Sequence, residues 1–168
     1  MDILWAPWRS KYIESLGKSD QCIFCIAAQE KDSQKVLKLY QTEHCLVVLN
    51  LYPYNTAHTM IAPIRHIGKF EQLTEPELLD ININTQRAIK IINKLFNPGA
   101  YNLGANLGKI AGAGIPGHFH LHLVPRWEGD THFMPIFGET KVFSFSLSEI
   151  WTKMYQEFNS FRDDGNQS

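Results

Sequence analysis

The chain of 168 residues has no long hydrophobic run, no excess of either charge and only three cysteines. Crossing a bilayer takes about 20 consecutive apolar residues, and the N-terminus lacks the charged-then-apolar order of a secretion signal. We therefore expect a cytoplasmic protein that does not contact a membrane. Sixteen basic and seventeen acidic residues give a net charge of -1, which supplies no basic field for a nucleic-acid polymer.

The three cysteines are too few, and odd in number, for a secreted disulfide framework. Cys22 and Cys25 instead have the Cys-x-x-Cys spacing of a metal knuckle or a redox pair, or they are two buried thiols. Cys45 lies in an apolar run and is expected in the core. With 44% hydrophobic residues the chain predicts one globular domain over residues 1–161, followed by a flexible polar tail over 162–168.

The order of the predicted elements indicates an α+β fold. Four short apolar or alternating runs predict strands over residues 45–50, 58–62, 101–107 and 118–126. Two Ser/Thr-x-x-Glu capping boxes predict helices, one after Thr74 that stops at 97–99 and one after Ser146 that reaches Phe161. We expect an antiparallel sheet with the longer helix packed across one face.

Three histidines at two-residue spacing are the most informative feature of the chain. His118, His120 and His122 would place their imidazoles on one face of a strand and the apolar residues between them on the other. Alternatively, they are scattered histidines on a surface strand. Residues 104–117, just before them, hold five of the eleven glycines, and backbone N–H groups in such a loop can approach an anion closely. An anionic, phosphorylated small molecule facing the imidazoles is therefore the favoured ligand.

The pattern over residues 118–124 resembles the histidine-triad superfamily of nucleotide hydrolases and transferases. Asn50, His58 and Asn106, together with the segment 63–66, also fall where that family has counterparts. The flanking segments over residues 4–9 and 124–127 look most like the bacterial branch related to diadenosine tetraphosphate phosphorylases. The resemblance implies an enzyme acting on nucleoside polyphosphates, with diadenosine tetraphosphate as an example of a substrate.

The resemblance also implies the roles of the histidines. His120 would attack the α-phosphorus, His122 would donate to the phosphate or the leaving group, and His118 is the first residue of the triad. His58 would orient this cluster, although by itself it could be a structural histidine after a turn. Imidazole attacks only when neutral, and with an ordinary pKa of about 6.5 it is mostly neutral near pH 7.

Three other functions are compatible with these residues. The first is a purine nucleoside phosphoramidase, which would use the same nucleophile with an amine leaving group. The second is a non-catalytic nucleotide-binding protein, which the intact triad disfavours. The third is a metalloprotein in which the triad itself holds the metal.

The nucleotide site implied by the resemblance comprises Asn50, Leu49, Asn106, Lys109, Gly112, Gly114 and Arg126. Asn50 would bind the ribose hydroxyls, and Leu49 with Ile23 or Phe24 would form a slot for the base. Gly114 stands where many family members have serine or threonine, so phosphate contacts there would come from backbone N–H groups alone. Lys109 and Arg126 would neutralise polyphosphate charge, or they are solvated surface cations.

Zinc-containing relatives of this family imply a metal site made by Cys22, Cys25, His66 and His118. Such a site joins three distant segments, so zinc would be structural and would fasten the N-terminal region to the sheet. His44 is a less favoured ligand, and His132 has no assigned role.

The first twenty residues carry Trp5, Trp8 and Tyr12 in an aromatic arm. The arm would pack on its own domain, on a partner subunit or on a nucleobase. Because members of the family are typically homodimers, we expect a homodimer.

Overall fold

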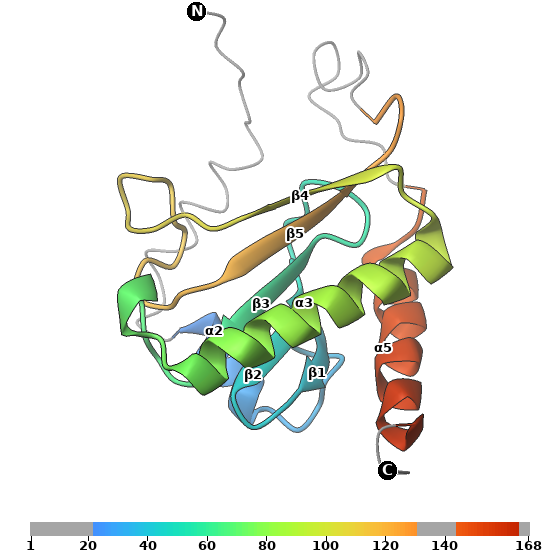
Figure 1. Ribbon diagram of the computed structural model, residues 1–168. Coiled ribbons are helices and arrows are strands. Elements are labelled where there is room, and N and C mark those ends of the chain that lie inside the picture. Colours follow the sequence, from blue (N-terminus) through green and yellow to red (C-terminus); the bar gives the residue numbers. More distant parts are fainter. Residues whose placement is uncertain (1–21, 131–143, 165–168) are drawn as a thin grey trace, which may run out of the picture.

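A computed structural model describes residues 22–130 and 144–164, in which five strands form one open antiparallel sheet (Figure 1). The strands are β1 (Lys38–Gln41), β2 (Cys45–Leu49), β3 (Thr59–Pro63), β4 (Ala100–Gly104) and β5 (Leu121–Arg126). Their order is β1-β2-β3-β5-β4, and every neighbouring pair is antiparallel. The antiparallel sheet expected from the sequence is confirmed, and β2 pairs with β3 so that Leu49 lies opposite Thr59 at the end of the ladder.

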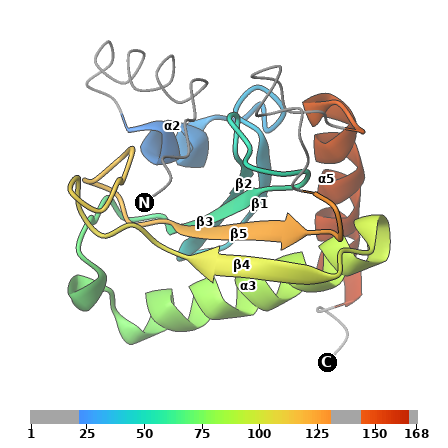
Figure 2. The same ribbon diagram turned by 90° about the horizontal axis from the view of Figure 1, so that it is seen from above.

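Helices cover both faces of the sheet (Figure 2). The long helix α3 (Glu75–Phe96) and the C-terminal helix α5 (Leu147–Asp164) pack on one face, and the short helix α2 (Ile23–Gln29) packs on the other. A 3-10 turn, η1 (Phe70–Gln72), precedes α3. Because both faces are covered, every residue of β2 and β3 is buried. The α+β class and the single domain expected from the sequence are confirmed.

Both long helices begin at the capping boxes read from the sequence. The Thr74 hydroxyl accepts a hydrogen bond from the Glu77 N–H, and the Glu77 carboxylate accepts one from the Thr74 N–H. Ser146 makes the same reciprocal pair with Glu149 before α5. Asn97 ends α3 in the left-handed conformation at φ 44°, directly before a proline.

The strand predicted over residues 118–126 begins only at Leu121, and the strand predicted over 101–107 ends at Gly104. At this end of the sheet, the ladder between β4 and β5 begins with the pair Gly104 and His122, so the residues of the connecting loop do not take part in that ladder. The backbone nevertheless stays alternating before Leu121. Phe119 joins the core under α3, whereas His118 and His120 contact Phe24 of α2 on the opposite face.

Several expectations fall at or beyond the limits of the description. Helix α5 continues through Asp164, so the first three residues of the predicted tail are helical. The aromatic arm over 1–20, His132 and residues 165–168 lie outside the described residues. Within the described ranges, no helix is both long and apolar enough to cross a membrane.

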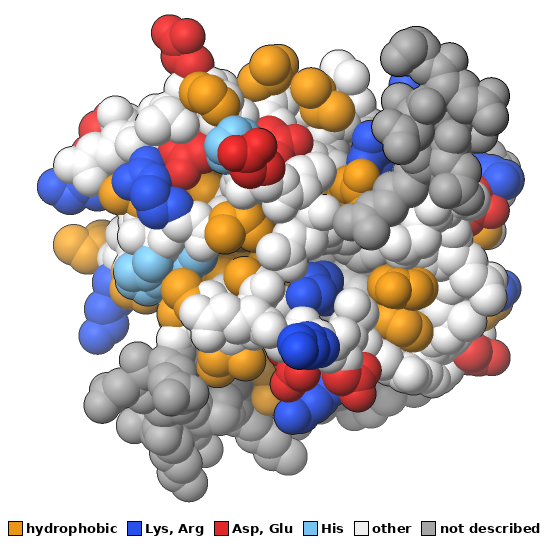
Figure 3. Space-filling view, turned by 90° about the horizontal axis from the view of Figure 1, so that it is seen from below, with side chains coloured by type: hydrophobic (Ala, Val, Ile, Leu, Met, Phe, Trp, Pro, Cys, Tyr) orange, Lys and Arg blue, Asp and Glu red, His pale blue; other side chains and the backbone are white. Residues whose placement is uncertain are grey.

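On the face drawn in Figure 3, basic side chains lie among acidic ones. Two of the ion pairs in the structure are Lys35 with Glu30 and Lys94 with Glu157.

Candidate active site and metal-ligand cluster

The face of the sheet under α2 gathers four of the histidines. His58 directly precedes β3, and Met60, two residues further on, pairs with His122 of β5, which brings the two histidine rings into contact. Their rings are 5.1 Å apart, and the ring of His120 lies 4.9 Å from that of His122. His58, His118 and His120 are all buried, with 1%, 1% and 6% of their surface exposed. The structure therefore brings together three histidines that the sequence separates by up to 64 positions.

Hydrogen bonding fixes which nitrogen of His120 carries its proton. The Nδ1 atom lies 2.8 Å from the carbonyl oxygen of His118. A carbonyl only accepts, so His120 Nδ1 donates, and in the neutral ring the lone pair stays on Nε2. Burial of the ring lowers the pKa of His120 below its ordinary value, which favours the neutral form at neutral pH. The site thus offers an imidazole nucleophile at Nε2.

The same reasoning applies to His58 and His122. The backbone N–H of Tyr54 donates to His58 Nδ1 over 3.0 Å, so this nitrogen is the acceptor and the proton lies on His58 Nε2. His58 Nε2 is 2.9 Å from His122 Nδ1 and donates to it. Neutral His122 therefore holds its own proton on Nε2, where it can donate to an anion.

A second cluster lies beside the histidine face. Cys22, Cys25, His66 and His118 each offer one ligand atom, and all four atoms lie within 4.8 Å of one another. Cys22 Sγ is 3.2 Å from His118 Nδ1, and Cys25 Sγ is 3.3 Å from His66 Nδ1. A tetrahedral zinc with bonds of about 2.3 Å to sulfur and 2.0–2.1 Å to nitrogen separates its ligands by about 3.5 Å. The donor set and its spacing fit a metal ion.

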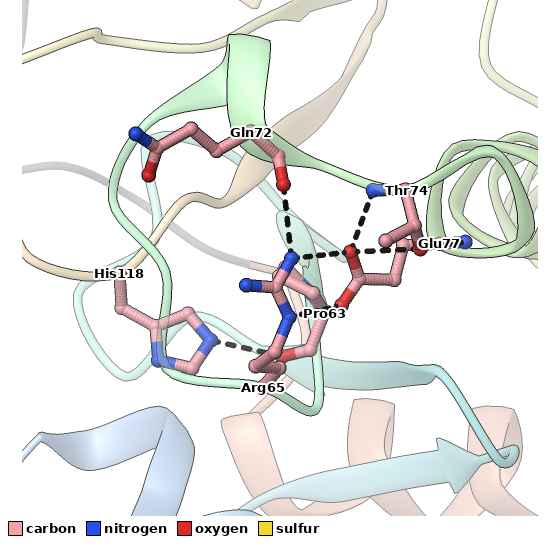
Figure 4. Close-up of polar contacts among 6 residues, drawn as sticks. All are labelled: Pro63, Arg65, Gln72, Thr74, Glu77 and His118. Atoms are coloured by element: carbon pink, nitrogen blue, oxygen red, sulfur yellow. Dashed lines mark hydrogen bonds and ion pairs between the residues drawn. The ribbon is translucent and has the colours of Figure 1, made fainter.

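His118 has the second hydrogen bond that metal-bound histidines usually make. Its Nε2–H donates to the carbonyl oxygen of Pro63 over 2.8 Å (Figure 4), which leaves the lone pair on Nδ1, facing the two thiols. His118 thus serves both clusters, because its side chain faces the cysteines and its carbonyl oxygen holds His120.

An ion pair next to His66 anchors the segment that carries this ligand (Figure 4). Arg65 Nε and Nη2 donate to the two carboxylate oxygens of Glu77 over 2.9 and 2.8 Å, and Nη2 also donates to the Gln72 carbonyl. These Arg65 bonds, with those from Thr74, lower the pKa of Glu77 to about 2. The segment is therefore tied to the first turn of α3.

The glycine loop is shaped by backbone conformation. Gly108 and Gly112 have φ values of 84° and 89°, which side-chain-bearing residues rarely adopt. The N–H of Gly112 donates to the Lys109 carbonyl, so here Gly112 forms a turn within the loop. Gly114 is half-buried, Lys109 is exposed, and Asn106 Nδ2 makes a long 3.4 Å contact with the Gly112 carbonyl.

Two residues expected at the nucleotide site make contacts within the fold. Leu49 is 3% exposed in the core beneath α3 and α5, because alternation along β2 turns it to the face opposite Val48. Arg126 ends β5 and forms an ion pair with Asp130, with bonds of 2.6 and 2.7 Å. The contribution of Leu49 and Arg126 to nucleotide binding stays a prediction.

Asn50 lies beside the histidines and is held by two contacts. Its Oδ1 accepts from the Tyr52 N–H over 3.0 Å, and its Nδ2 lies 3.3 Å from His58 Nδ1.

Two aromatic residues contribute more to the site than the sequence indicated. Phe24 is 1% exposed, and its ring lies 5.0 and 4.9 Å from the rings of His118 and His120. Tyr54 packs its ring 4.7 Å from that of His58. The position of Phe24 between the two cysteines could have indicated this role, whereas no sequence signal marks Tyr54. The His44 carbonyl accepts a hydrogen bond from the Ile64 N–H, and His44 is not part of the metal-ligand cluster found among the described residues.

Comparisons with known proteins agree with this geometry. A family model described as the HIT domain matches residues 29–129. An AP-4-A phosphorylase of Mycobacterium tuberculosis is 37% identical over 146 residues, covering 83% of this chain and 75% of that protein. An uncharacterised HIT-like protein of Methanocaldococcus jannaschii is 34% identical over 77% of this chain and 95% of its own. The structure of a Zn-bound histidine-triad protein from Mycobacterium smegmatis superposes with a TM-score of 0.66 at 19% identity, covering 86% and 97% of the two chains.

Proposed function

The chain belongs to the HIT family and is an enzyme of that family, and from this premise we propose that it cleaves the α-phosphate linkage of dinucleoside polyphosphates. Diadenosine tetraphosphate is the proposed substrate, because the relative of known name that spans most of the chain is an AP-4-A phosphorylase. The observation that carries the proposal is the proton placement on His120, which leaves a nucleophilic lone pair on Nε2.

In the first step, His120 Nε2 forms a bond to the α-phosphorus while the bond from phosphorus to the bridging oxygen breaks. The electron pair of the broken bond leaves with the bridging oxygen, so ATP departs as an anion. His122 Nε2–H, 4.9 Å away between ring centres, is the proposed hydrogen-bond donor to that oxygen or to the phosphoryl group. The product on the enzyme is an adenylyl group on His120.

In the second step, an acceptor oxygen attacks the same phosphorus and the bond to His120 Nε2 breaks, which restores the neutral imidazole. Water as acceptor loses a proton to solvent and gives AMP, whereas orthophosphate gives ADP. The hydrogen bond from His120 Nδ1 to the His118 carbonyl stabilises the positive charge that the ring carries in the intermediate.

The nucleotide contacts remain proposals that rest on the family resemblance. Asn50 is placed beside His58 and would bind the ribose hydroxyls. Asn106, Gly112 and Gly114 would contact the phosphates from the glycine loop, and the exposed Lys109 would neutralise their charge.

We also propose that the metal is zinc, held by Cys22, Cys25, His66 and His118. Two thiolates and two imidazoles form a closed four-ligand set, which is typical of a structural zinc site. When bound, the metal would cross-link α2 to the segments that flank β3 and β5, and it leaves no open position for a substrate.

Product analysis tests the proposed reaction. Diadenosine tetraphosphate is incubated with the protein with and without orthophosphate, and the products are identified by mass spectrometry. AMP plus ATP, or ADP plus ATP when phosphate is the acceptor, supports the proposal. Two molecules of ADP in the absence of phosphate would mean cleavage at the central linkage and would contradict it. Adenosine 5′-phosphoramidate, assayed in parallel, tests the alternative amine leaving group.

We further propose a cytoplasmic homodimer. In the part of the chain that the structure describes, β4 is an edge strand with Leu103 53% exposed, a surface that a second copy could cover. Light scattering coupled to gel filtration measures the mass in solution.

A further inference from the structure

We propose that Asn50 is a positioning residue that, together with the backbone N–H of Tyr54, selects the protonated nitrogen of His122. The Asn50 side chain and the Tyr54 backbone amide both approach His58 Nδ1 as donors, which leaves the proton of His58 on Nε2. His58 Nε2–H then donates to His122 Nδ1, so the proton of His122 lies on its own Nε2. The inference deepens the proposed function and rests on it only where it assigns a catalytic use to the His122 proton. The arrangement of protons on His58 can be tested without substrate.

The fold places Asn50 at the end of β2 with its backbone locked to His58. The last ladder pair of β2 and β3 joins Leu49 to Thr59, and the Asn50 N–H then donates to the His58 carbonyl over 2.9 Å. Residues 51–57 therefore form a loop closed by this bond. The two side chains leave adjacent backbone positions and meet beside β5.

The orientation of the Asn50 amide follows from its second contact. The Tyr52 N–H donates to Asn50 Oδ1 over 3.0 Å, so the oxygen of the amide faces the loop. The NH₂ group must then face His58 Nδ1, 3.3 Å away. A flipped amide would place two donors against each other at the Tyr52 position.

Two donors therefore point at one nitrogen of a buried imidazole. Tyr54 N–H approaches His58 Nδ1 at 3.0 Å and Asn50 Nδ2 at 3.3 Å, while only 1% of the surface of His58 is exposed. A proton on Nδ1 would face both donors and break both hydrogen bonds, which is costly in a buried site. The proton is thus held on His58 Nε2, and His122 receives it at Nδ1 and keeps its own proton on Nε2.

The chemistry of an asparagine at this position is specific. Aspartate has nearly the same shape, but its carboxylate only accepts hydrogen bonds. An Asn50→Asp variant would therefore attract a proton to His58 Nδ1. If the ring stays neutral, His58 Nε2 becomes an acceptor, His122 Nδ1 must donate to it, and His122 Nε2 loses the proton that the substrate would receive. Asparagine thus keeps His122 a donor.

Nitrogen NMR of ¹⁵N-histidine-labelled protein without substrate measures this arrangement directly. The chemical shifts and couplings distinguish protonated from unprotonated ring nitrogens. In the wild type we expect His58 with a proton on Nε2 and none on Nδ1. In Asn50→Asp we expect a protonated Nδ1, whereas in Asn50→Ala the Tyr54 amide still donates to Nδ1, so the proton should stay mainly on Nε2. Asn82→Asp adds the same charge on the exposed surface of α3 and should leave the spectrum of His58 unchanged.

A leaving-group comparison tests the use of the His122 proton. A hydrogen bond to the departing oxygen matters more as that oxygen becomes more basic. Asn50→Asp should therefore lower kcat/KM for the phenyl ester of AMP on the order of tenfold more than for the p-nitrophenyl ester. A lost ribose contact would lower both esters equally, and a 2′-deoxy series measures that part separately.

The outcomes separate the two proposals. A protonated His58 Nδ1 in the wild type, or an Asn50→Asp spectrum identical to the wild type, overturns the inference. An equal loss with both esters overturns the donation of the His122 proton to the departing oxygen. If the NMR result is as expected but no dinucleoside polyphosphate or AMP ester is cleaved, the positioning of His58 stands and the proposed function fails.

Discussion

Phe24 should be the residue whose truncation most strongly damages both clusters at once. It lies between the two cysteines on α2, is 1% exposed, and contacts the rings of His118 and His120. Replacing a buried phenylalanine by alanine costs about 3–5 kcal/mol through lost burial and the cavity that remains. Against a total stability of about 5–15 kcal/mol, this is a large fraction. Phe24→Leu keeps most of the volume and should cost about 1–1.5 kcal/mol.

Urea unfolding of the metal-loaded protein measures these costs, and elemental analysis gives the metal content of each variant. Because Phe24 touches the ring of the proposed nucleophile, Phe24→Leu should lower kcat while KM changes little. A base slot formed by Phe24 would instead raise KM. Ile23→Ala is the matched control, since Ile23 is 45% exposed on the same helix and its loss should cost about 0.5 kcal/mol or less. If Phe24→Ala costs less than about 1 kcal/mol and retains its metal, the ring does not support the site.

Three further changes probe the surroundings. Arg65 holds the pKa of Glu77 at about 2 against 4.5, so this ion pair stabilises the fold above pH 5 and the contribution disappears as the pH falls toward 2. If the whole pKa shift of Glu77 were converted into folding free energy, it would amount to roughly 3 kcal/mol. Because Arg65 is half-exposed and solvent screens the pair, we expect Glu77→Gln to cost about 1–2 kcal/mol at pH 7. The unfolding curves of the variant and the wild type should converge near pH 2. Cys22→Ser should lower the melting temperature and the zinc content together, and a chelator should destabilise the wild type but not the variant. If the chelator leaves the melting temperature of the wild type unchanged, the cysteines do not hold a structural metal. Gly68→Ala should be destabilising by about 1–3 kcal/mol in urea unfolding, because an added Cβ would overlap the backbone of Pro116, and wild-type stability in this variant would show that the two loops can separate.

The parts of the fold that the sequence predicted well depend on local interactions. The capping boxes at Thr74 and Ser146 define where α3 and α5 begin, because each satisfies backbone N–H groups within four residues. The alternation of His118, His120 and His122 with apolar residues also holds, although β5 begins only at Leu121. Alternation is a property of extended backbone and does not require a ladder partner.

The elements that the sequence did not predict depend on distant contacts. Strand β1 is stabilised by α5, where Trp151 Nε1 donates to the carbonyl of Lys38. Helix α2 has seven residues and no side-chain cap, so its stability comes from packing Phe24 and Ala27 on the sheet. Neither the contact of β1 with α5 nor the packing of α2 on the sheet can be recognised from a pattern of neighbouring residues in the sequence.

The contacts that Leu49 and Arg126 make within the fold did have a signal in the sequence. Leu49 is four positions from Cys45, which the sequence placed in the core, and an even separation on a strand puts both on the same face. Arg126 precedes Asp130 by four residues, and the turn after β5 brings their side chains together. The gathering of His58 beside His122 could not be derived from local pattern, because it depends on the pairing of β3 with β5.

The most direct test of the central claim is to trap the intermediate on His120. The protein is mixed with diadenosine tetraphosphate for a fraction of one turnover, quenched in alkali to preserve a phosphorus–nitrogen bond, digested and analysed by tandem mass spectrometry. We predict one adenylyl group on His120, absent from His120→Ala, with amounts that rise and fall as the substrate is consumed. Turnover without any adenylylated His120, or an adenylyl group on another residue that forms at the rate of turnover, would contradict the account.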